Sequence, residues 1–533
     1  MDGLLAYGEG ARTLILAALG VLVAAAAAAA AILLPAGRIR AAAMLLALAL
    51  FPLLILGDQW HSPQIVDLRD DPMRFAGLAT IAAAATAVLA ATFHRWPILL
   101  PLAIVAALPF RVPLEAGGDT ANLLVPLYLV IAAGVIAAVA SEWGGRVSGL
   151  LAASRFSHSP PSESGGTPGE KPSMQTGHPS ALPLALAAVV VLYVLQTLYS
   201  PDFSKSLQNV CFFFVPFSLV YALLRDIRWD RKLLKCVLLV VAVEAVAFVL
   251  VGSVEYVTRE LFWNDQVIRS NEFHTYFRVN SIFWDPNIYG RYLALAIVVA
   301  MAVLLWVKEK KQLALLTGLV AVLWLGLVPT FSQSSFVALL VGLAVLASLR
   351  WSWKWAVAAV GAGAVFAVVI VIFAGGVSKL SPDHLNVVTG GRTNLASGGV
   401  KLFSQRPLWG YGAGSFPRAY REHAATKKTP VAVSHTEPVT VAAEQGLVGL
   451  VAYVALLLVA LWTMSTGLRW GRGGADTPQP PAPTIARAAV LAAFVALLAH
   501  TIAYAAFYED PIAWVLLAVA TSLAATPAVR APA

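Results

Sequence analysis

The chain has few charged residues, few cysteines and no internal repeat. Charged side chains make up 12% of its 533 residues, whereas soluble domains carry about 25%. Hydrophobic residues account for 59% of the chain. Apolar runs of about 20 residues, the length that crosses the hydrocarbon of a bilayer as a helix, recur along the whole sequence. These proportions exclude a soluble globular protein and predict an all-α polytopic membrane protein.

The two cysteines do not indicate a disulfide. Cys211 and Cys236 are expected near opposite faces of the membrane, which is too far apart, because bridged Cα atoms lie about 4.4–6.8 Å from each other. The lack of a repeat also removes the signature of a transporter built from two related halves.

The apolar runs predict about fifteen transmembrane helices. They are expected at residues 12–34, 41–57, 75–93, 97–113, 122–141, 181–199, 208–224, 233–253, 286–307, 313–329, 333–349, 355–374, 438–463, 486–506 and 511–526. The short loop after each odd-numbered span is basic, as at Arg38, Arg228 and Lys311. Because basic short loops stay in the cytoplasm, the N-terminus is predicted outside and the C-terminus inside.

One segment divides the chain into two parts. Residues 154–180 are rich in Ser, Pro and Gly without an apolar period, which is typical of a disordered linker. We expect this linker in the cytoplasm. It would separate an N-terminal membrane module of about five spans, residues 1–153, from a membrane domain at residues 181–533.

A hydrophilic, basic loop at residues 375–436 breaks the pattern of loop charges. The alternation of spans places it outside, which is permitted because long loops cross despite their charge. Either its cations are simply solvated, or they bind an anionic, lipid-linked substrate. The cations are Lys379, Arg392, Lys401, Arg406, Arg418, Arg421, Lys427 and Lys428.

A first group of polar residues lies where the span at 286–307 begins, on the expected outer face. Asp285 suits a helix N-cap and Pro286 the first helical position, which is a purely structural explanation. Asn287 and Arg291 are four residues apart and share one helix face. Arg291 lies about 9 Å inside the helix, where it either snorkels back to the interface or serves a function. Arg278 precedes this group.

A second group lies in the basic loop. Gly410, Gly412 and Gly414 lack the strand–turn–helix context of a phosphate-binding loop. We therefore expect a tight turn that packs the loop onto the membrane domain. Arg392 and Arg406 are better phosphate ligands, because one guanidinium can engage two phosphate oxygens.

A third group begins the span at 438–463. The imidazole of His435 titrates near neutrality and can take a proton from a hydroxyl nucleophile, although a lone histidine at a helix start is more often a surface or capping residue. Glu437 and Glu444 are seven residues apart and so share a helix face. Glu444 lies about 10 Å deep and is expected to need a partner such as an arginine.

Together these groups resemble the O-antigen ligase and polymerase family over roughly residues 190–525. The family's Thr-x-Ser-Arg element reads Thr330-Phe331-Ser332-Gln333 here, without the arginine. The matching elements are Arg278 with Asp285-Pro286-Asn287, Gly391-Arg392, Pro407-Leu-Trp-Gly410-Tyr-Gly412, His435 and Glu444-Gln-Gly446.

The resemblance implies a GT-C-like fold whose outer loop contains short helices. It further implies an inverting, metal-independent glycosyl transfer on the outer face of the bacterial cytoplasmic membrane, without a cofactor. The donor would be a glycan on an undecaprenyl-diphosphate-type carrier, and the acceptor a glycan, a lipid or a protein. Membrane lipids are further expected partners, and nucleic acid is not.

The resemblance also implies roles for single residues. His435 would activate the acceptor hydroxyl, and arginines would hold the diphosphate and stabilise the charge that develops as it leaves. No acidic cluster suitable for Mg²⁺ accompanies them. The diphosphate ligands would be Arg278, Arg291, Arg392 and Arg406, with Asp285, Asn287, Glu437 and Glu444 in support.

Three alternatives stay open. Ligase and polymerase activities are not separable by these residues. A transporter or flippase would need ionisable residues near the midplane, such as Glu244, and related halves. A sensor or scaffold could bind an anionic polymer through the outer loop without any reaction.

Overall fold

The structure is a computed structural model. It describes residues 2–60, 62–116, 119–144, 181–273, 276–354, 357–358, 361, 392–424, 434–468 and 480–525. The predicted linker at 154–180 and most of the predicted span at 355–374 lie outside the described residues.

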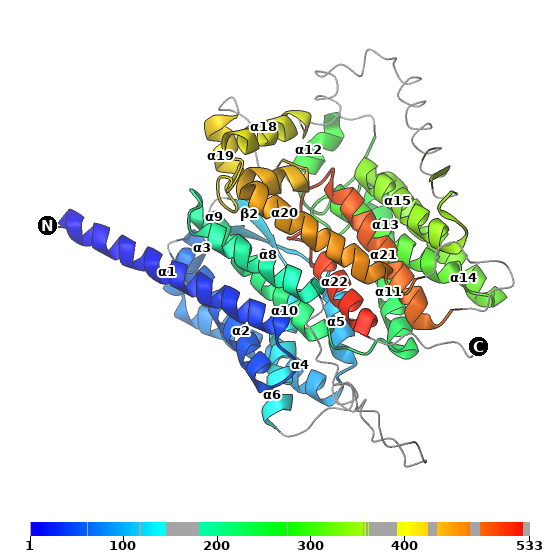
Figure 1. The fold of residues 1–533 in the computed structure, drawn as a ribbon, viewed down its shortest axis with the longest axis horizontal. Coiled ribbons are helices and arrows are strands. Elements are labelled where there is room, and N and C mark those ends of the chain that lie inside the picture. The colour runs from blue at the N-terminus through cyan, green and yellow to red at the C-terminus, as the bar shows by residue number, and fades with distance from the viewer. Residues whose placement is uncertain are drawn as a thin grey trace, which may run out of the picture.

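Helices dominate the described chain, and one antiparallel hairpin interrupts them (Figure 1). The first part contains α1 (Asp2–Leu33), α2 (Arg38–Asp58), α3 (Pro63–Asp70), α4 (Pro72–Arg95), α5 (Leu99–Ala107), β1 (Val112–Ala116), β2 (Asp119–Leu123) and α6 (Val125–Trp143). The middle part contains α8 (Ala181–Thr197), α9 (Phe203–Asn209), a π-helical turn (Val210–Phe214), α10 (Val215–Leu224), α11 (Arg231–Thr258), α12 (Asp265–Phe273), α13 (Pro286–Leu304), α14 (Lys310–Leu327) and α15 (Gln333–Arg350). The last part contains α18 (Arg392–Gln405), α19 (Phe416–His423), α20 (Glu437–Ser465), α21 (Ala482–Thr501) and α22 (Pro511–Ala525).

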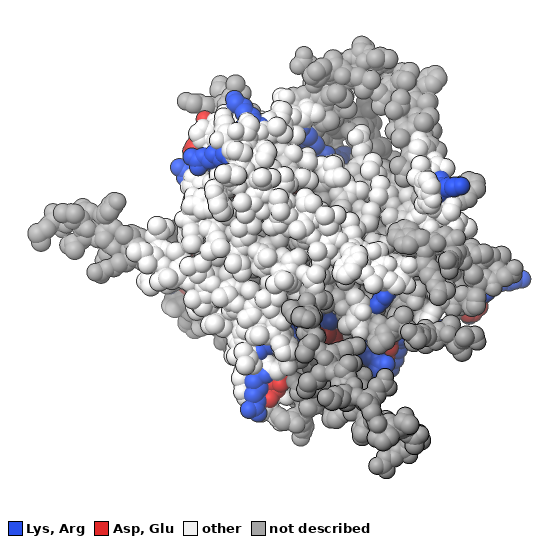
Figure 2. All heavy atoms as spheres, viewed as in Figure 1, with Lys and Arg blue, Asp and Glu red and all other residues white. Residues whose placement is uncertain are grey.

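Within the described residues, 11 helices are long and apolar enough to cross a membrane, and α8 and α22 are shorter apolar helices. Each coincides with a predicted span, so the prediction of an all-α polytopic membrane protein is confirmed. In Figure 2, lysine and arginine side chains gather near the upper edge of the face in view and along its lower and right edges, whereas the middle is largely uncharged. Such an uncharged band is what contact with lipid requires.

The predicted span at 97–113 is wrong. Helix α5 ends at Ala107, and the hairpin of β1 and β2 follows it. Pro109 and Pro113 explain the difference, because proline lacks the amide donor of a helix and its ring clashes with the preceding turn. The helix is therefore about 13 Å long, less than half of the hydrocarbon core.

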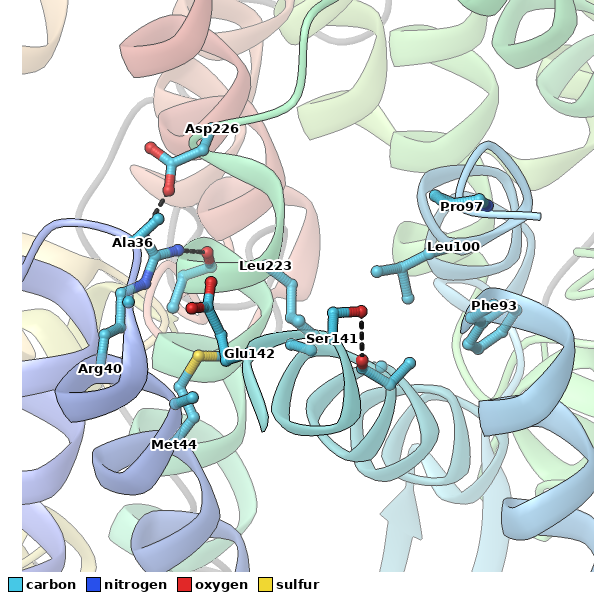
Figure 3. Close-up of a pocket in the computed structure, with 16 residues that line it drawn as sticks. Ala36, Arg40, Met44, Phe93, Pro97, Leu100, Ser141, Glu142, Leu223 and Asp226 are labelled. Carbon is cyan, nitrogen blue, oxygen red and sulfur yellow. Dashed lines mark hydrogen bonds and ion pairs between the residues drawn. The ribbon is translucent and has the colours of Figure 1, made fainter. Parts of the chain in front are cut away.

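Loops that were predicted on one side of the membrane meet at one end of the bundle. The Arg40 guanidinium of α2 forms an ion pair with Asp226, which follows α10 (Figure 3). A cavity of about 90 Å³ lies beside this contact. Arg350 likewise donates from Nε to the Leu305 carbonyl at 3.3 Å, which joins the ends of α15 and α13. At these two contacts, loops that were predicted on the same side lie at the same end of the bundle.

The N-terminal helices pack onto the later ones. Helix α1 lies along α8 and α10, and α5 lies against α11. Val21 of α1, Leu186 of α8 and Val220 of α10 belong to one continuous apolar core. At the opposite end of the bundle, α18 and α19 cover the beginning of α20 (Figure 1).

Helix α20 is broken at Gly446, whose backbone has φ 65° and ψ −162°. The segment 407–412 docks at the break: Gly412 N–H donates to the Glu444 carbonyl at 2.7 Å, and Leu447 N–H donates to the Pro407 carbonyl at 2.7 Å. A Cβ on Gly446 would lie 2.4 Å from the Leu408 carbonyl oxygen. The glycine-rich turn therefore packs the outer loop onto the membrane domain, as predicted.

Gly446→Ala is expected to lower the free energy of unfolding by about 2–4 kcal/mol. The left-handed conformation costs an alanine about 1–2 kcal/mol, and displacement of the docked segment weakens hydrogen bonds of about 1 kcal/mol each. Thermal unfolding of the purified protein in detergent measures the change. Gly318→Ala in α14 is the matched control, because no atom lies within 4 Å of the added Cβ. Equal unfolding temperatures for both variants would contradict this account.

Candidate functional site

Five polar side chains converge at the end of the bundle that faces α18 and α19. Arg278 is in electrostatic contact with Asp285, Arg392 and Tyr504, and His435 with Arg392 and Asp285. Four of the five were predicted from the sequence as site residues. They come from different segments of the chain, so the fold creates the group.

Asp285 has two functions in this arrangement. Its Oδ1 accepts a hydrogen bond from the backbone N–H of Asn287 at 2.6 Å, so it caps α13 as a helix start requires. Its Oδ2 accepts a hydrogen bond from the hydroxyl of Tyr504 at 3.3 Å. The cap therefore also positions Tyr504, which the sequence placed on a helix but which lies beyond the end of α21.

Arg278 is held on both its backbone and its side chain. The Asn271 side chain of α12 accepts from the Arg278 N–H at 3.0 Å and donates to the Arg278 carbonyl at 2.9 Å. The guanidinium donates from Nε to the Thr330 carbonyl at 2.9 Å and from Nη2 to Asn287 Oδ1 at 3.3 Å. Within the described residues Nη1 makes no hydrogen bond, which leaves that edge of the guanidinium available for an anion.

The Thr330–Ser332 turn supports Arg278 and Asn287 although it lacks an arginine. Phe331 has φ 48°, which turns the Thr330 carbonyl and the Ser332 side chain toward α13. Ser332 Oγ donates to Asn287 Oδ1 at 2.9 Å, and Ser334 Oγ lies 3.1 Å from Nε2 of the buried His500. The Thr330–Ser332 turn therefore holds the side chains of Arg278 and Asn287 in place through hydrogen bonds.

His435 has a strained backbone that several contacts hold in place. Its φ is 61°, a left-handed conformation that costs a non-glycine residue of order 1–3 kcal/mol. Its carbonyl accepts from the Ala505 N–H at 3.2 Å. Ser434 Oγ accepts from the Thr436 N–H at 3.1 Å and lies 2.7 Å from Thr440 Oγ1. The strain therefore fixes the direction in which the imidazole points.

The surroundings of His435 favour its neutral form. Burial and the neighbouring Arg392 lower the pKa of His435, and Asp285 acts in the opposite direction. The imidazole centroid lies 6.2 Å from that of Tyr504. A neutral imidazole at neutral pH is able to accept a proton.

Arg291 does not snorkel to the interface. Its Nη2 lies 2.9 Å from Oδ2 of Asp510, and both side chains are 2% exposed. Arg111, in the segment after α5, is in electrostatic contact with both residues. Arg291 is therefore a charge fixed inside the bundle behind Tyr504.

Sequence reasoning missed Asp510 and Arg111. Asp510-Pro511 opens α22 as Asp285-Pro286 opens α13, and the Asp510 carboxylate likewise accepts from the N–H two residues later, at 2.9 Å. That repeated Asp-Pro pattern was a usable signal. Arg111 offered none, because it stood inside a stretch that the apolar pattern predicted to be a span.

Glu437 and Glu444 bind backbone amides rather than an arginine, so the predicted partner of Glu444 is wrong. Glu444 accepts from the N–H groups of Gly414 and Phe416, both at 2.9 Å. Glu437 accepts from the Phe507 N–H at 3.1 Å. Loop segments approaching α20 leave their amides without partners, and the two carboxylates satisfy them.

Arg406 lies apart from the convergent group. It is exposed, and its guanidinium lies 4.5 Å from the centroid of the Tyr411 ring. Arg392 and Arg406 stand at opposite ends of α18, about 20 Å apart at 1.5 Å per residue. The structure therefore does not bring these two arginines to one diphosphate. Gly391 lies outside the described residues.

Glu244, the midplane carboxylate that a transporter would need, has a partner in the bundle. The Tyr292 hydroxyl donates to its Oε2 at 2.9 Å. This contact accounts for Glu244 as part of helix packing between α11 and α13.

The comparisons with known proteins match one part of the chain. A family model described as O-antigen ligase matches residues 318–454. Of the convergent residues, Arg392 and His435 lie inside this segment, while Arg278, Asp285 and Tyr504 lie outside it. No curated protein sequence matches the chain.

Arg392→Gln is expected to raise the pKa of His435, because Arg392 is one of the two causes that lower it. In the wild-type protein the imidazole becomes protonated only below its usual range, and in the variant protonation begins at higher pH. Diethyl pyrocarbonate acylates neutral imidazole, so the modification of His435 against pH, followed by peptide mass spectrometry, reports the shift. Arg406→Gln, at the far end of α18, is the control. Superimposable profiles for Arg392→Gln and the wild type would contradict the assigned contact.

Proposed function

We propose, from the match of residues 318–454 to the O-antigen ligase family, that the chain moves a glycan from a polyprenyl-diphosphate carrier to an acceptor hydroxyl. The family makes it an O-antigen ligase-like or polymerase-like membrane enzyme. The carrier, of the undecaprenyl-diphosphate type, and the outer face of the cytoplasmic membrane as the place of reaction belong to the proposal.

One observation carries the proposal: a neutral histidine and two arginines share one site at the end of the bundle. Arg278 and Arg392 lie close enough for their charges to repel each other. A dianionic group between them would relieve that repulsion, and guanidinium groups match phosphate oxygens in geometry. His435 stands beside them with a lowered pKa, so its imidazole is unprotonated at neutral pH and able to accept a proton.

In the proposed reaction the acceptor hydroxyl gives its proton to the His435 imidazole as its oxygen attacks the anomeric carbon. The bond between that carbon and the carrier phosphate breaks, and the diphosphate leaves with the electron pair. Attack from the side opposite the leaving group inverts the anomeric configuration. Arg278 and Arg392 stabilise the charge that grows on the diphosphate, so the step needs no metal ion.

The other residues position these three. Asp285 and Tyr504 orient the site through their hydrogen bond. Asn287 Oδ1 accepts a hydrogen bond from the Arg278 guanidinium and so holds it in place. We propose that Arg291 and Arg111, which together share the carboxylate of Asp510 and leave one net positive charge, supply a fixed positive field without touching the substrate. Glu437 and Glu444 hold the loop on the bundle, and Arg406 stays outside the site.

His435→Ala is expected to lower the rate of glycan transfer by about 10²–10⁴-fold, because general-base catalysis contributes roughly that factor. The assay measures glycan joined to acceptor in membranes that contain the lipid-linked donor. His423→Ala is the matched control, since His423 is 43% exposed and lies beside Glu422 in α19. Full transfer by the His435→Ala protein, present at the wild-type level, would refute the enzymatic proposal.

The outer placement of the site has a separate test. In a variant without its two native cysteines, a cysteine at Arg421 is expected to react with a membrane-impermeant maleimide added to intact spheroplasts. A cysteine at Lys310, on the basic end, should react only after lysis. Both positions are exposed, so access to the side chain is not limiting. The reverse pattern of labelling would overturn the orientation.

A further inference from the structure

An apolar cavity of about 300 Å³ lies among α5, α11, α13, α21 and α22. These helices pack against one another in the bundle. The cavity has the size of a small-molecule pocket, about 300–1,000 Å³. Its wall consists mainly of aliphatic side chains, such as Leu238, Val299, Val490 and Leu516. Because apolar cavities do not hold ordered water, an apolar chain is the ligand that this space suits.

The cavity runs along the length of α13. Tyr292 and Val307 both line it, and 15 residues of α13 and its extension separate them, which is about 22 Å at 1.5 Å per residue. That distance exceeds half of the hydrocarbon core of about 30 Å. A lipid chain anchored at one interface could therefore lie inside it.

The two ends of the cavity differ. Tyr292 and Ile512 line the end nearest the functional site, directly below the buried pair of Arg291 and Asp510. At the other end the lining includes Trp229, Arg231 and Lys235. The lining of the first end includes no charged side chain, whereas the second end presents an aromatic ring and two cations.

The cationic end carries a net positive charge. Arg231 and Lys235 are exposed and four residues apart at the start of α11, so they share one helix face. Neither side chain forms a hydrogen bond or an ion pair with another residue that the structure describes. The acids nearby are engaged: the Asp230 carboxylate accepts from the Leu233 N–H at 2.8 Å, and Asp226 pairs with Arg40.

We propose that this cavity binds an anionic phospholipid from the leaflet at the basic end. One acyl chain lies in the cavity, and the phosphate is bound by Arg231 and Lys235. Basic pockets between transmembrane helices on the cytoplasmic side are suited to anionic lipid headgroups. The lipid fills space among five helices that include α13 and α22, which carry Asn287, Arg291 and Asp510, and so supports the packing of the site from below.

The tail of the lipid-linked donor is the competing occupant. Its diphosphate would bind at the end where Arg278 and His435 lie, and the cavity lining at that end has no charged side chain. The charge at the mouth also favours a headgroup at the basic end, because a donor lipid would place its diphosphate at the opposite one. These two observations favour the phospholipid.

The experiment measures lipid binding by the full-length protein and needs no glycan transfer, so its outcome is independent of the proposed function. The protein is delipidated in detergent and titrated with dioleoyl phosphatidylglycerol and, separately, with dioleoyl phosphatidylcholine, with binding followed by native mass spectrometry. We expect preference for phosphatidylglycerol. Arg231→Gln with Lys235→Gln should weaken it about 30-fold, since each cation contributes about 1 kcal/mol and 1.4 kcal/mol is tenfold.

Two further variants make the test specific. Lys310→Gln with Lys311→Gln removes two exposed cations from the same end that do not line the cavity, and should leave the affinity unchanged. Ala489→Phe places a ring in the cavity and should weaken binding of both lipids. Equal affinity for the two lipids, or equal effects of the two charge variants, would refute the site. So would retention of a polyprenyl lipid that Ala489→Phe abolishes, because the cavity would then belong to the donor.

Discussion

Polar groups inside this bundle must find their partners in the chain itself, because lipid offers none. The break of α20 at Gly446 exposes backbone groups, and the segment 407–412 satisfies them by docking there. Glu444 then accepts the amides that the docked loop leaves unpaired. The outer loop is thus attached to the membrane domain by hydrogen bonds on both sides of the break. Its attachment brings Arg392, at the start of α18, and His435, at the start of α20, to the same end of the bundle.

The same constraint divides the charges of the site into two layers. Arg291 and Asp510 are almost fully buried and neutralise each other. They form the inner layer, whose side chains are fixed inside the bundle. Partial burial leaves the second layer accessible at this end of the bundle; it consists of Arg278, Asp285, Arg392 and His435. Backbone strain at His435 and the hydrogen bond from Tyr504 to Asp285 preorganise the second layer. Preorganisation of this kind is what transition-state stabilisation requires.

The sequence predicted the features that depend on local chemistry. Apolar runs located the spans, and motif order identified Arg278, Asp285, Arg392 and His435. The sequence did not predict the contacts that depend on which distant segments pack together. Arg406 has the right chemistry but stands at the wrong end of α18. The buried Glu444 predicted an arginine partner, but its carboxylate accepts hydrogen bonds from two backbone amides. Every residue type except proline has such an amide, so the sequence does not reveal this partner. Asp510 and Arg111 are distant in sequence from the motifs, and only the packing of α22 and the segment after α5 onto α13 brings them near Arg291. The predicted span at 97–113 is wrong because Pro109 and Pro113 prevent the helix from continuing, although most of the segment is apolar.

The central claim is that Arg278 and Arg392 bind the diphosphate of the donor beside His435. A cryo-electron microscopy structure of the protein with geranylgeranyl diphosphate tests it most directly. The account predicts phosphate oxygens at about 3 Å from both guanidinium groups, next to the imidazole. Diphosphate density at Arg406, or at Arg231 and Lys235 on the opposite end of the bundle, with the His435 site empty, would contradict it.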